Sequence, residues 1–304
     1  MRSQAVFVLS IMLAGCASTA RIDQFRSFAD LGHKHQVALG SVVDQAVSSN
    51  IDANSQEILN AREQYEPKKQ WPSPGGADEI LDEQNQAVIA TTRQYAAVRR
   101  HAALLDDYFR SLAALASYDS APIAASTAAT VEAIQGLSPT LQNLKVGNTT
   151  LPQAVSGLVP VVVNGIKGRL LDRELRQHGD VINRELELQE RVLAFVAERI
   201  AADQELLAQR RILDKLAVPF GDLSKPLPAD WTTARREILM AQAMSAEPGA
   251  EAAKVSRELG KAFLQLLEGK LSPEGVSSLA TDLSRLLTLI EVVSAKASGG
   301  ANEP

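Results

Sequence analysis

The chain has 304 residues, a formal net charge of −5 at pH 7 and a single cysteine. A mildly acidic chain is poorly suited to the phosphates of nucleic acids or to a surface of anionic lipids, so the charge argues against both as partners. One cysteine leaves no internal disulfide, so the stability of the fold must come from packing. Aromatic residues make up only 4% of the chain, and alanine, leucine, glutamine, glutamate and arginine dominate it. This composition is typical of long helices and coiled coils.

The first 16 residues have the pattern of an export signal. Arg2 is followed by an apolar run over residues 5–13 and then by the small residues Ala14 and Gly15. A positive start, a short apolar segment and small residues before a cleavage point are typical of a secretory signal peptide. The run is about half as long as a membrane-spanning helix needs to be, so it does not predict a permanent span.

The residues Leu13-Ala14-Gly15-Cys16 resemble the lipobox of bacterial lipoproteins, in which the cysteine is acylated and becomes the first residue of the mature chain. The resemblance implies that residues 1–15 are removed, that Cys16 carries the lipid and that residues 16–21 form a short, extended tether. Ala17 implies attachment to the outer membrane, facing the periplasm, because aspartate at that position is the familiar signal for retention in the inner membrane. An ordinary signal peptide followed by a chance cysteine is the alternative.

Two long helices are predicted next, over residues 22–64 and 78–118. In both, apolar side chains recur every three or four residues, which places them on one face of a helix. These positions include Ile22, Phe25, Phe28, Leu31, Leu39, Val42, Ala46, Ala53 and Leu59 in the first, and Ile80, Leu81, Tyr95, Val98, Leu105, Tyr108, Phe109 and Leu112 in the second. Prolines and glycines in residues 66–76 predict a loop between them. An acidic cluster is predicted to lie in the first turns of the second helix, where the helix dipole favours anions; it consists of Asp78, Glu79, Asp82 and Glu83.

The middle of the chain, residues 120–166, carries only two charged residues, Glu132 and Lys145. Its prolines and glycines predict two or three short, kinked helices that start at Ser138-Pro139 and at Thr150-Leu151-Pro152. The most apolar positions of this part are Leu158, Val159, Pro160, Val161, Val162, Val163 and Ile166.

Two interpretations fit this neutral segment. The favoured one makes it the buried centre of the bundle, where small residues let helices approach closely. The other makes it an element that acts on membranes. A charge-free segment between long helices is similar in layout to the α-helical pore-forming toxins, whose long helices carry an apolar tongue. That resemblance implies that residues 151–168 could enter lipid when exposed.

A further long helix is predicted over residues 169–217, ending at Val218-Pro219. Three shorter helices follow within residues 231–297, over 231–246, over 249–268 and from Ser272-Pro273 onward, and residues 298–304 are predicted to be disordered. The sequence therefore predicts an all-α fold. Residues 22–217 form a long antiparallel helical bundle resembling a coiled coil, and residues 231–297 form a smaller C-terminal helical group.

No catalytic, cofactor or metal site is predicted. His33 and His35 are two residues apart, so on a helix they point in different directions and cannot easily share an ion. Both are predicted to face solvent, and His101 and His178 are isolated in the sequence. The acidic cluster lacks the alternating spacing and the glycine of a calcium loop. Glycine motifs that bind phosphates or dinucleotides are absent, as is the nucleophile elbow of hydrolases.

The sequence predicts a lipoprotein of the bacterial envelope that is anchored through Cys16 and is not an enzyme. It would act as a scaffold or accessory through contacts with an envelope protein or with a second copy of itself. The alternative function is a membrane-perturbing helical protein that acts through residues 151–168.

Overall fold

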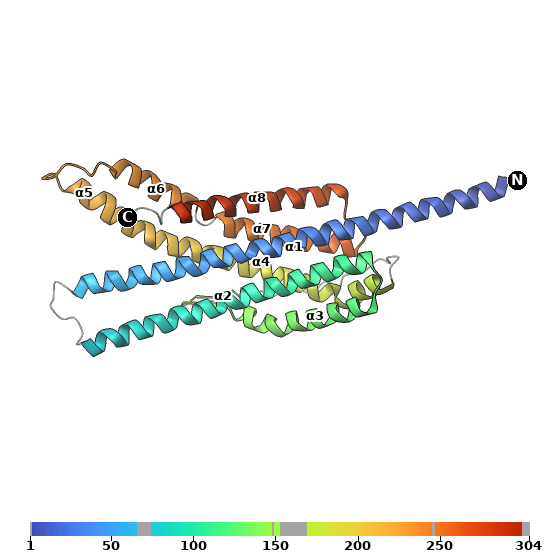
Figure 1. Ribbon diagram of the computed structural model, residues 1–304, viewed down its shortest axis with the longest axis horizontal. Helices are drawn as coiled ribbons and strands as arrows, with labels where there is room; N and C mark the ends of the chain where they lie inside the picture. Colours follow the sequence, from blue (N-terminus) through green and yellow to red (C-terminus); the bar gives the residue numbers. More distant parts are fainter. Residues whose placement is uncertain (1, 66–73, 148, 153–168, 245–246, 300–304) are drawn as a thin grey trace.

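The computed structural model describes residues 2–65, 74–147, 149–152, 169–244 and 247–299 (Figure 1). Over these residues the chain is an all-α helical bundle, which confirms the predicted fold class. Its elements in chain order are α1 (Arg2–Tyr65), α2 (Pro74–Ser117), α3 (Ala121–Gln142), β1 (Lys145–Val146), β2 (Thr149–Thr150), α4 (Arg169–Ile212), the π-helical turn η2 (Leu213–Ala217), α5 (Val218–Gly221), α6 (Trp231–Met244), α7 (Glu247–Leu267) and α8 (Pro273–Gly299).

The three longest helices, α1, α2 and α4, form the body of the bundle (Figure 1). Helix α1 contacts both α2 and α4, and α3 packs against α2 and α4. Helix α7 packs on α4 and α1, α8 packs on α7 and α1, and α6 packs on α4 and η2. Two of the C-terminal helices therefore contribute to the same core as the long helices.

Aromatic rings from three helices meet in this core. Phe28 of α1 lies edge-on to Phe109 of α2, with ring centroids 5.8 Å apart, and stacks on Phe263 of α7 at 5.7 Å. All three side chains are fully buried. Burying one phenylalanine contributes about 1.5–3 kcal/mol, and each ring pair adds about 0.5–1.5 kcal/mol. This cluster therefore fixes α7 against the α1–α2 pair.

The first helix starts earlier than predicted. Helix α1 runs without interruption from Arg2 to Tyr65, so residues 16–21 are helical and the prediction of an extended tether is wrong. Residues 17–28 contain neither proline nor glycine, so nothing in the local sequence ends a helix there.

The second helix also starts earlier than predicted, at Pro74. The acidic cluster Asp78, Glu79, Asp82 and Glu83 therefore lies beyond the first turn of α2, and all four side chains are exposed. Proline suits a first helical position because its missing N–H has no partner there. The dipole explanation for the cluster is thus wrong, since the effect is confined to the first turn.

The neutral segment contains one 22-residue helix where shorter helices were predicted. Pro139 was predicted to start a helix but lies inside α3, close to its end. The helix continues past it because Val131, Ile134, Ser138 and Leu141 form one buried face at spacings of three and four residues. A two-stranded antiparallel sheet follows, pairing Lys145–Val146 with Thr149–Thr150, and it was not predicted.

Helix α4 ends at Ile212, and a π-helical turn and the short α5 carry the helical chain on to Gly221, past the predicted end at Val218-Pro219. At this end of the molecule the helices extend beyond the common core. Leu59 of α1 and Ile80 and Leu81 of α2 were predicted to be buried but are exposed. A regular apolar pattern therefore continues past the point where other helices cover it.

Two glycines of α1 should respond in opposite ways to replacement by alanine. A Cβ atom at Gly32 would lie 2.7 Å from the buried ring of Phe109, whereas at Gly40 it would meet nothing within 4 Å. We expect Gly32→Ala to lower the free energy of unfolding by about 1–3 kcal/mol through overpacking. Gly40→Ala, its matched control, should raise that free energy by about 0.5–1 kcal/mol through helix propensity. Urea denaturation followed by circular dichroism measures both, and equal effects would contradict this account of the α1–α2 contact.

Candidate functional site

The structure leaves the two sites predicted from the sequence, Cys16 and the apolar positions of residues 158–166, largely undescribed. The apolar positions from Leu158 to Ile166 lie outside the described residues, so both interpretations of them stay predictions. The backbone of Cys16 lies in α1, and its side chain is not described. Within the described part of the chain, no helix is both long and apolar enough to cross a membrane. The same residues hold no group of three or more side chains that could ligate a metal ion.

The prediction that His33 and His35 face solvent is wrong. His35 is completely buried in the core, and its ring nitrogens have no hydrogen-bond partner among the described residues. His33 is partly buried and pairs with Asp106 of α2, which also forms an ion pair with Arg110 at 3.1 Å. The two rings do point apart, as the spacing predicts, but one points into the core and the other toward α2.

His101 is also buried and belongs to a hydrogen-bonded group that the sequence did not predict. Its Nε2 lies 3.1 Å from Oε2 of Glu185 on α4. The hydroxyl of Ser138 on α3 donates to Oε1 of the same carboxylate at 2.6 Å. All three side chains are buried. The Glu185 carboxylate therefore binds α2 and α3 to α4 inside the bundle.

A second polar layer lies four residues further along α4. Gln189 and Gln36 of α1 exchange two amide hydrogen bonds of 3.0 and 2.7 Å. Ser256 of α7 donates to Gln189 at 3.3 Å. This layer joins α1 and α7 to α4, so the two layers together involve five helices.

A groove of about 320 Å³ opens between α3 and α4 above the Glu185 group. Its walls carry Gln135 and Gln142 from α3 and Arg184 and Arg191 from α4, and Ser138 and Glu185 also line it. Serine and carboxylate are the residue types of hydrolytic sites, but here the carboxylate is shared between the hydroxyl and His101. This arrangement holds the hydroxyl in a buried network, so we interpret the group as structural.

Near the other end of α3, a cluster of buried polar atoms has weaker pairing. Glu174 Oε2 lies 4.0 Å from His178 Nε2. Glu174 Oε1, His178 Nε2 and the Tyr108 hydroxyl have no hydrogen-bond partner among the described residues. Burial raises the pKa of Glu174 to about 7 and raises the pKa of Tyr108 well above its ordinary value, helped by the nearby Glu174 charge. These groups therefore favour their neutral forms in the folded protein.

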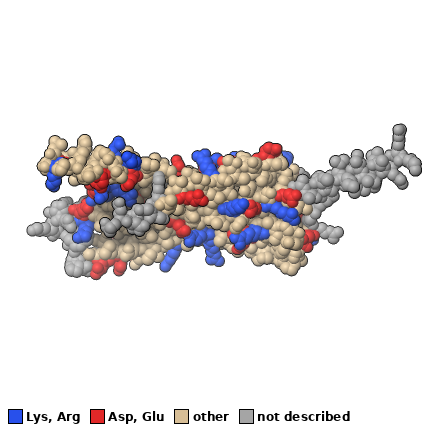
Figure 2. Space-filling model, turned by 45° about the horizontal axis from the view of Figure 1, so that its top comes forward, with Lys and Arg blue, Asp and Glu red and all other residues tan. Residues whose placement is uncertain are grey.

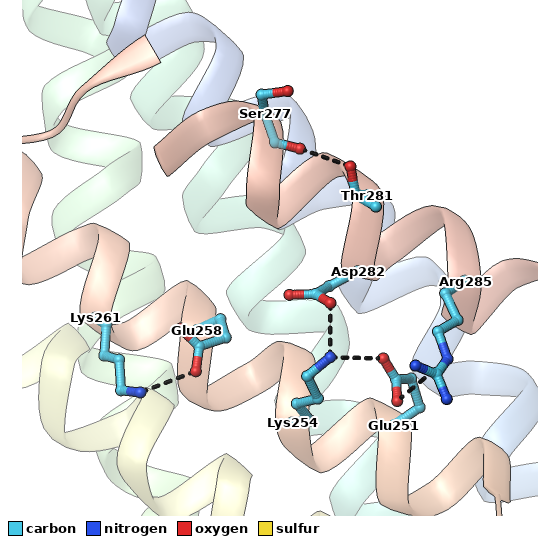
Figure 3. Close-up of polar contacts among 8 residues, drawn as sticks. All are labelled: Glu251, Lys254, Glu258, Lys261, Ser277, Thr281, Asp282 and Arg285. Atoms are coloured by element: carbon cyan, nitrogen blue, oxygen red, sulfur yellow. Dashed lines mark hydrogen bonds and ion pairs between the residues drawn. The ribbon is translucent and has the colours of Figure 1, made fainter. Parts of the chain in front are cut away.

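Charged side chains also join α7 to α8 at the edge of the bundle (Figure 3). The Lys254 ammonium lies between two carboxylates, 3.2 Å from Glu251 and 2.6 Å from Asp282. Hydrogen bonds to Asp282 and Glu251 raise the pKa of Lys254. Arg285 lies 3.8 Å from Glu251, on the side away from Lys254. This network explains the buried Glu251 carboxylate, so it needs no ligand.

The most unusual surface lies at the end of the bundle opposite the N-terminus, where the chain forms two projecting parts (Figure 1). The first is the end of the α1–α2 pair, residues 51–63 and 77–89, which we call the hairpin end. The second is formed by residues 211–240 of η2, α5, α6 and their connections, which we call the arm. The exposed large apolar side chains of the hairpin end are Ile51, Leu59, Ile80, Leu81 and Ile89, and those of the arm are Leu213, Val218, Phe220, Leu223, Leu227, Leu239 and Met240.

The arm has a small core of its own. Ala208, Leu216 and Ile238 are buried together, with Trp231 packed beside them and stacked on Phe220 at 5.8 Å. The exposed apolar side chains of the arm are therefore held on an ordered element. Arg210, beside the arm, pairs with Glu63 of the hairpin end at 2.6 Å. The hairpin end and the arm thus lie next to each other at one end of the molecule (Figures 1 and 2).

The buried histidines and the residues of the two polar layers were not predicted, although the sequence contains a signal for them. His35 falls in the seam Phe28, Leu31, His35, Leu39 and Val42, at spacings of three and four residues. His101 follows the same rule between Val98 and Leu105, and Glu185 and Gln189 do so between Ile182 and Leu193. A polar residue at a seam position is expected to be buried and paired.

Comparison with known proteins finds no match: no protein-family model matches this chain, and neither a curated protein nor a solved structure is significantly similar to it.

Replacing His35 by leucine should make the protein more resistant to acid. Burial lowers the pKa of His35 from 6.5 to about 3, so over that range the unfolded chain binds a proton that the folded chain does not. Stability from this group is therefore lost as the pH falls below 6.5, by about 1.4 kcal/mol per pH unit. We expect His35→Leu to gain stability over the natural protein by that amount as the pH falls.

Urea denaturation between pH 4 and pH 8 measures this difference in the free energy of unfolding. Glu174 titrates in part of the same range but is present in both proteins, so its effect cancels in the difference. A difference that does not change with pH would show that His35 binds protons equally in the folded and unfolded chain, so that burial does not lower its pKa.

Proposed function

We propose that this protein is a lipoprotein of the bacterial envelope that acts as a scaffold or accessory through protein contacts and not as an enzyme. The anchor part of the proposal rests on the lipobox resemblance at Cys16. The contact part rests on the hairpin end and the arm, where twelve large apolar side chains are exposed together. Such surfaces in a folded protein mark interaction sites more often than chance exposure does.

The arrangement of the helices is consistent with an anchor at one end of the molecule and a contact surface at the other. The N-terminus and the exposed surface lie at opposite ends of the long axis (Figure 1). From Ile22 to Tyr65, α1 alone rises about 65 Å. A chain anchored near Cys16 would therefore present the hairpin end and the arm far from the membrane surface, where an envelope partner could reach them.

The polar groups of the interior support a structural protein in a different way. Within the Glu185 layer and within the Gln189 layer, the polar side chains are hydrogen-bonded to partners on neighbouring helices. The groove above Glu185 does not combine a free nucleophile with a separate base, which an acyl-transfer site would need.

The anchor is tested by substitution of Cys16 and its neighbour in the full chain. We expect Cys16→Ser to abolish incorporation of labelled palmitate and to release the protein from the membrane fraction. The control Ala17→Asp should keep the label but move the protein from the outer to the inner membrane. Label that persists in Cys16→Ser would refute the lipobox assignment.

Protein contact is tested by placing a photo-crosslinking amino acid at single exposed positions of the full chain in living cells. Leu81 of the hairpin end and Leu223 of the arm should give protein adducts, and Tyr118, 70% exposed near the opposite end, should not. Equal adduct formation at the three positions would contradict a specific surface. Dye release from liposomes by the purified protein, abolished by Val162→Asp, would instead support the membrane-perturbing alternative.

A further inference from the structure

The described hairpin end is strongly acidic, and the arm beside it exposes four basic side chains that have no ion pair among the described residues. The described hairpin end holds one arginine, Arg62, and seven carboxylates: Asp52, Glu57, Glu63, Asp78, Glu79, Asp82 and Glu83. The acidic cluster of α2 accounts for four of these, all exposed and without an ion pair in the described part of the chain. Figure 2 shows both acidic and basic side chains at this end of the molecule.

The arm carries five basic and four acidic residues, so it is only weakly basic. Two of its carboxylates, Asp214 and Asp222, pair with Arg210 and Lys225, whereas Asp230 and Glu237 are exposed and have no ion pair among the described residues. Arg211, Lys215, Arg235 and Arg236 are all exposed, and no ion pair to them is found among the described residues. Elsewhere on the described surface, arginine and lysine commonly have a carboxylate within 4 Å, as Arg176, Lys254 and Lys261 do. A partner surface that is both acidic and apolar would bind these unpaired arginine and lysine side chains together with the exposed apolar side chains next to them.

The molecule itself contains one contact of this type. Arg210 at the base of the arm pairs with Glu63 of the hairpin end and with Asp214 at 2.6 Å each. Among the unpaired side chains of the arm, four are basic and two, Asp230 and Glu237, are acidic, so the balance complements the acidic hairpin end. Both parts also expose large apolar side chains. A protein with two complementary surfaces side by side at one end can pair with itself, because a two-fold axis brings each surface of one copy against the other surface of its partner.

We propose that the partner at this end of the bundle is a second copy of the chain, with the hairpin end of each copy against the arm of the other. This inference rests on the proposed function and names its partner. A two-fold axis parallel to the helices keeps both N-termini on one side, as two anchors in one membrane require. The twelve exposed apolar side chains provide the apolar part of the contact. The unpaired charges at its edge set its register and exclude the parallel pairing of like surfaces.

Charge reversal tests the proposal in full-length chains produced in cells with two different tags. One variant, Glu79→Lys with Asp82→Lys, makes the hairpin end basic. The other, Arg235→Glu with Arg236→Glu, makes the arm acidic. A photo-crosslinking amino acid at Leu223 reports dimers that contain both tags. We expect each variant alone to lose dimers by about tenfold or more, because like charges then face each other.

Produced together, the two variants should recover the dimer, since the basic hairpin end of one then faces the acidic arm of the other. This recovery also shows that neither variant is misfolded. Recovery only when all four changes are in one chain, with no crosslink between tags, would mean that the arm closes on its own hairpin end and would overturn the proposal. Adducts with a different envelope protein, and none between tags, would overturn self-association but leave the proposed function standing. No adduct of either kind would contradict both.

Discussion

The carboxylate of Glu185 is the group on which the alignment of the long helices depends. It lies in the core of α4 and binds His101 of α2 and Ser138 of α3 at the same time. If α4 slid by one turn, this buried carboxylate would lose both partners, and breaking the pairing of a buried charge costs about 3–5 kcal/mol. Apolar seams alone tolerate such slips, because one leucine replaces another. The Gln36–Gln189 pair repeats the constraint for α1, so polar residues fix the register while apolar residues provide most of the stability.

Close packing adds a second constraint around these layers. A Cβ atom on Gly249 of α7 would lie 2.9 Å from the Cβ of Ala197 on α4, so the two helices approach through their smallest residues. Helix α7 can then place Phe263 against Phe28. The close approach also brings Ser256 within reach of Gln189. Packing of small residues and pairing of polar ones thus depend on each other, and α7 cannot be separated from the body of the bundle without breaking both.

Much of the fold could be predicted from the sequence, because a helix with a periodic apolar face must bury that face. The long helices and the buried positions from Phe25 to Ala53 follow from that rule. Its exceptions depend on what other helices cover. Leu59, Ile80 and Leu81 continue the pattern but remain exposed, and helical periodicity cannot show where a neighbouring helix ends. His35 and His101 are buried for the opposite reason: their seam positions outweigh their polarity. Pro139 lies inside α3 because tertiary packing on one face outweighs a local signal.

The apolar face of α1 is covered by other helices in the centre of the bundle but exposed toward the hairpin end. This contrast is the observation that bears most directly on function. In the centre, every seam position on α1 from Phe25 to Ala46 is covered by α2, α4, α7 or α8. Beyond Ala53 the same pattern continues on α1, and at Ile80 and Leu81 on α2, with side chains that are exposed, and the arm exposes its own apolar side chains beside them. If α1 and α2 served only to cover the hydrophobic core, both helices could end where the core ends. Extending it by several turns costs conformational entropy and exposes apolar surface to water, neither of which stabilises an isolated chain. Burial against another polypeptide would remove that apolar surface from water and offset the entropy cost. The acidic hairpin end beside the unpaired basic side chains of the arm favours the proposed partner, a second copy of the chain.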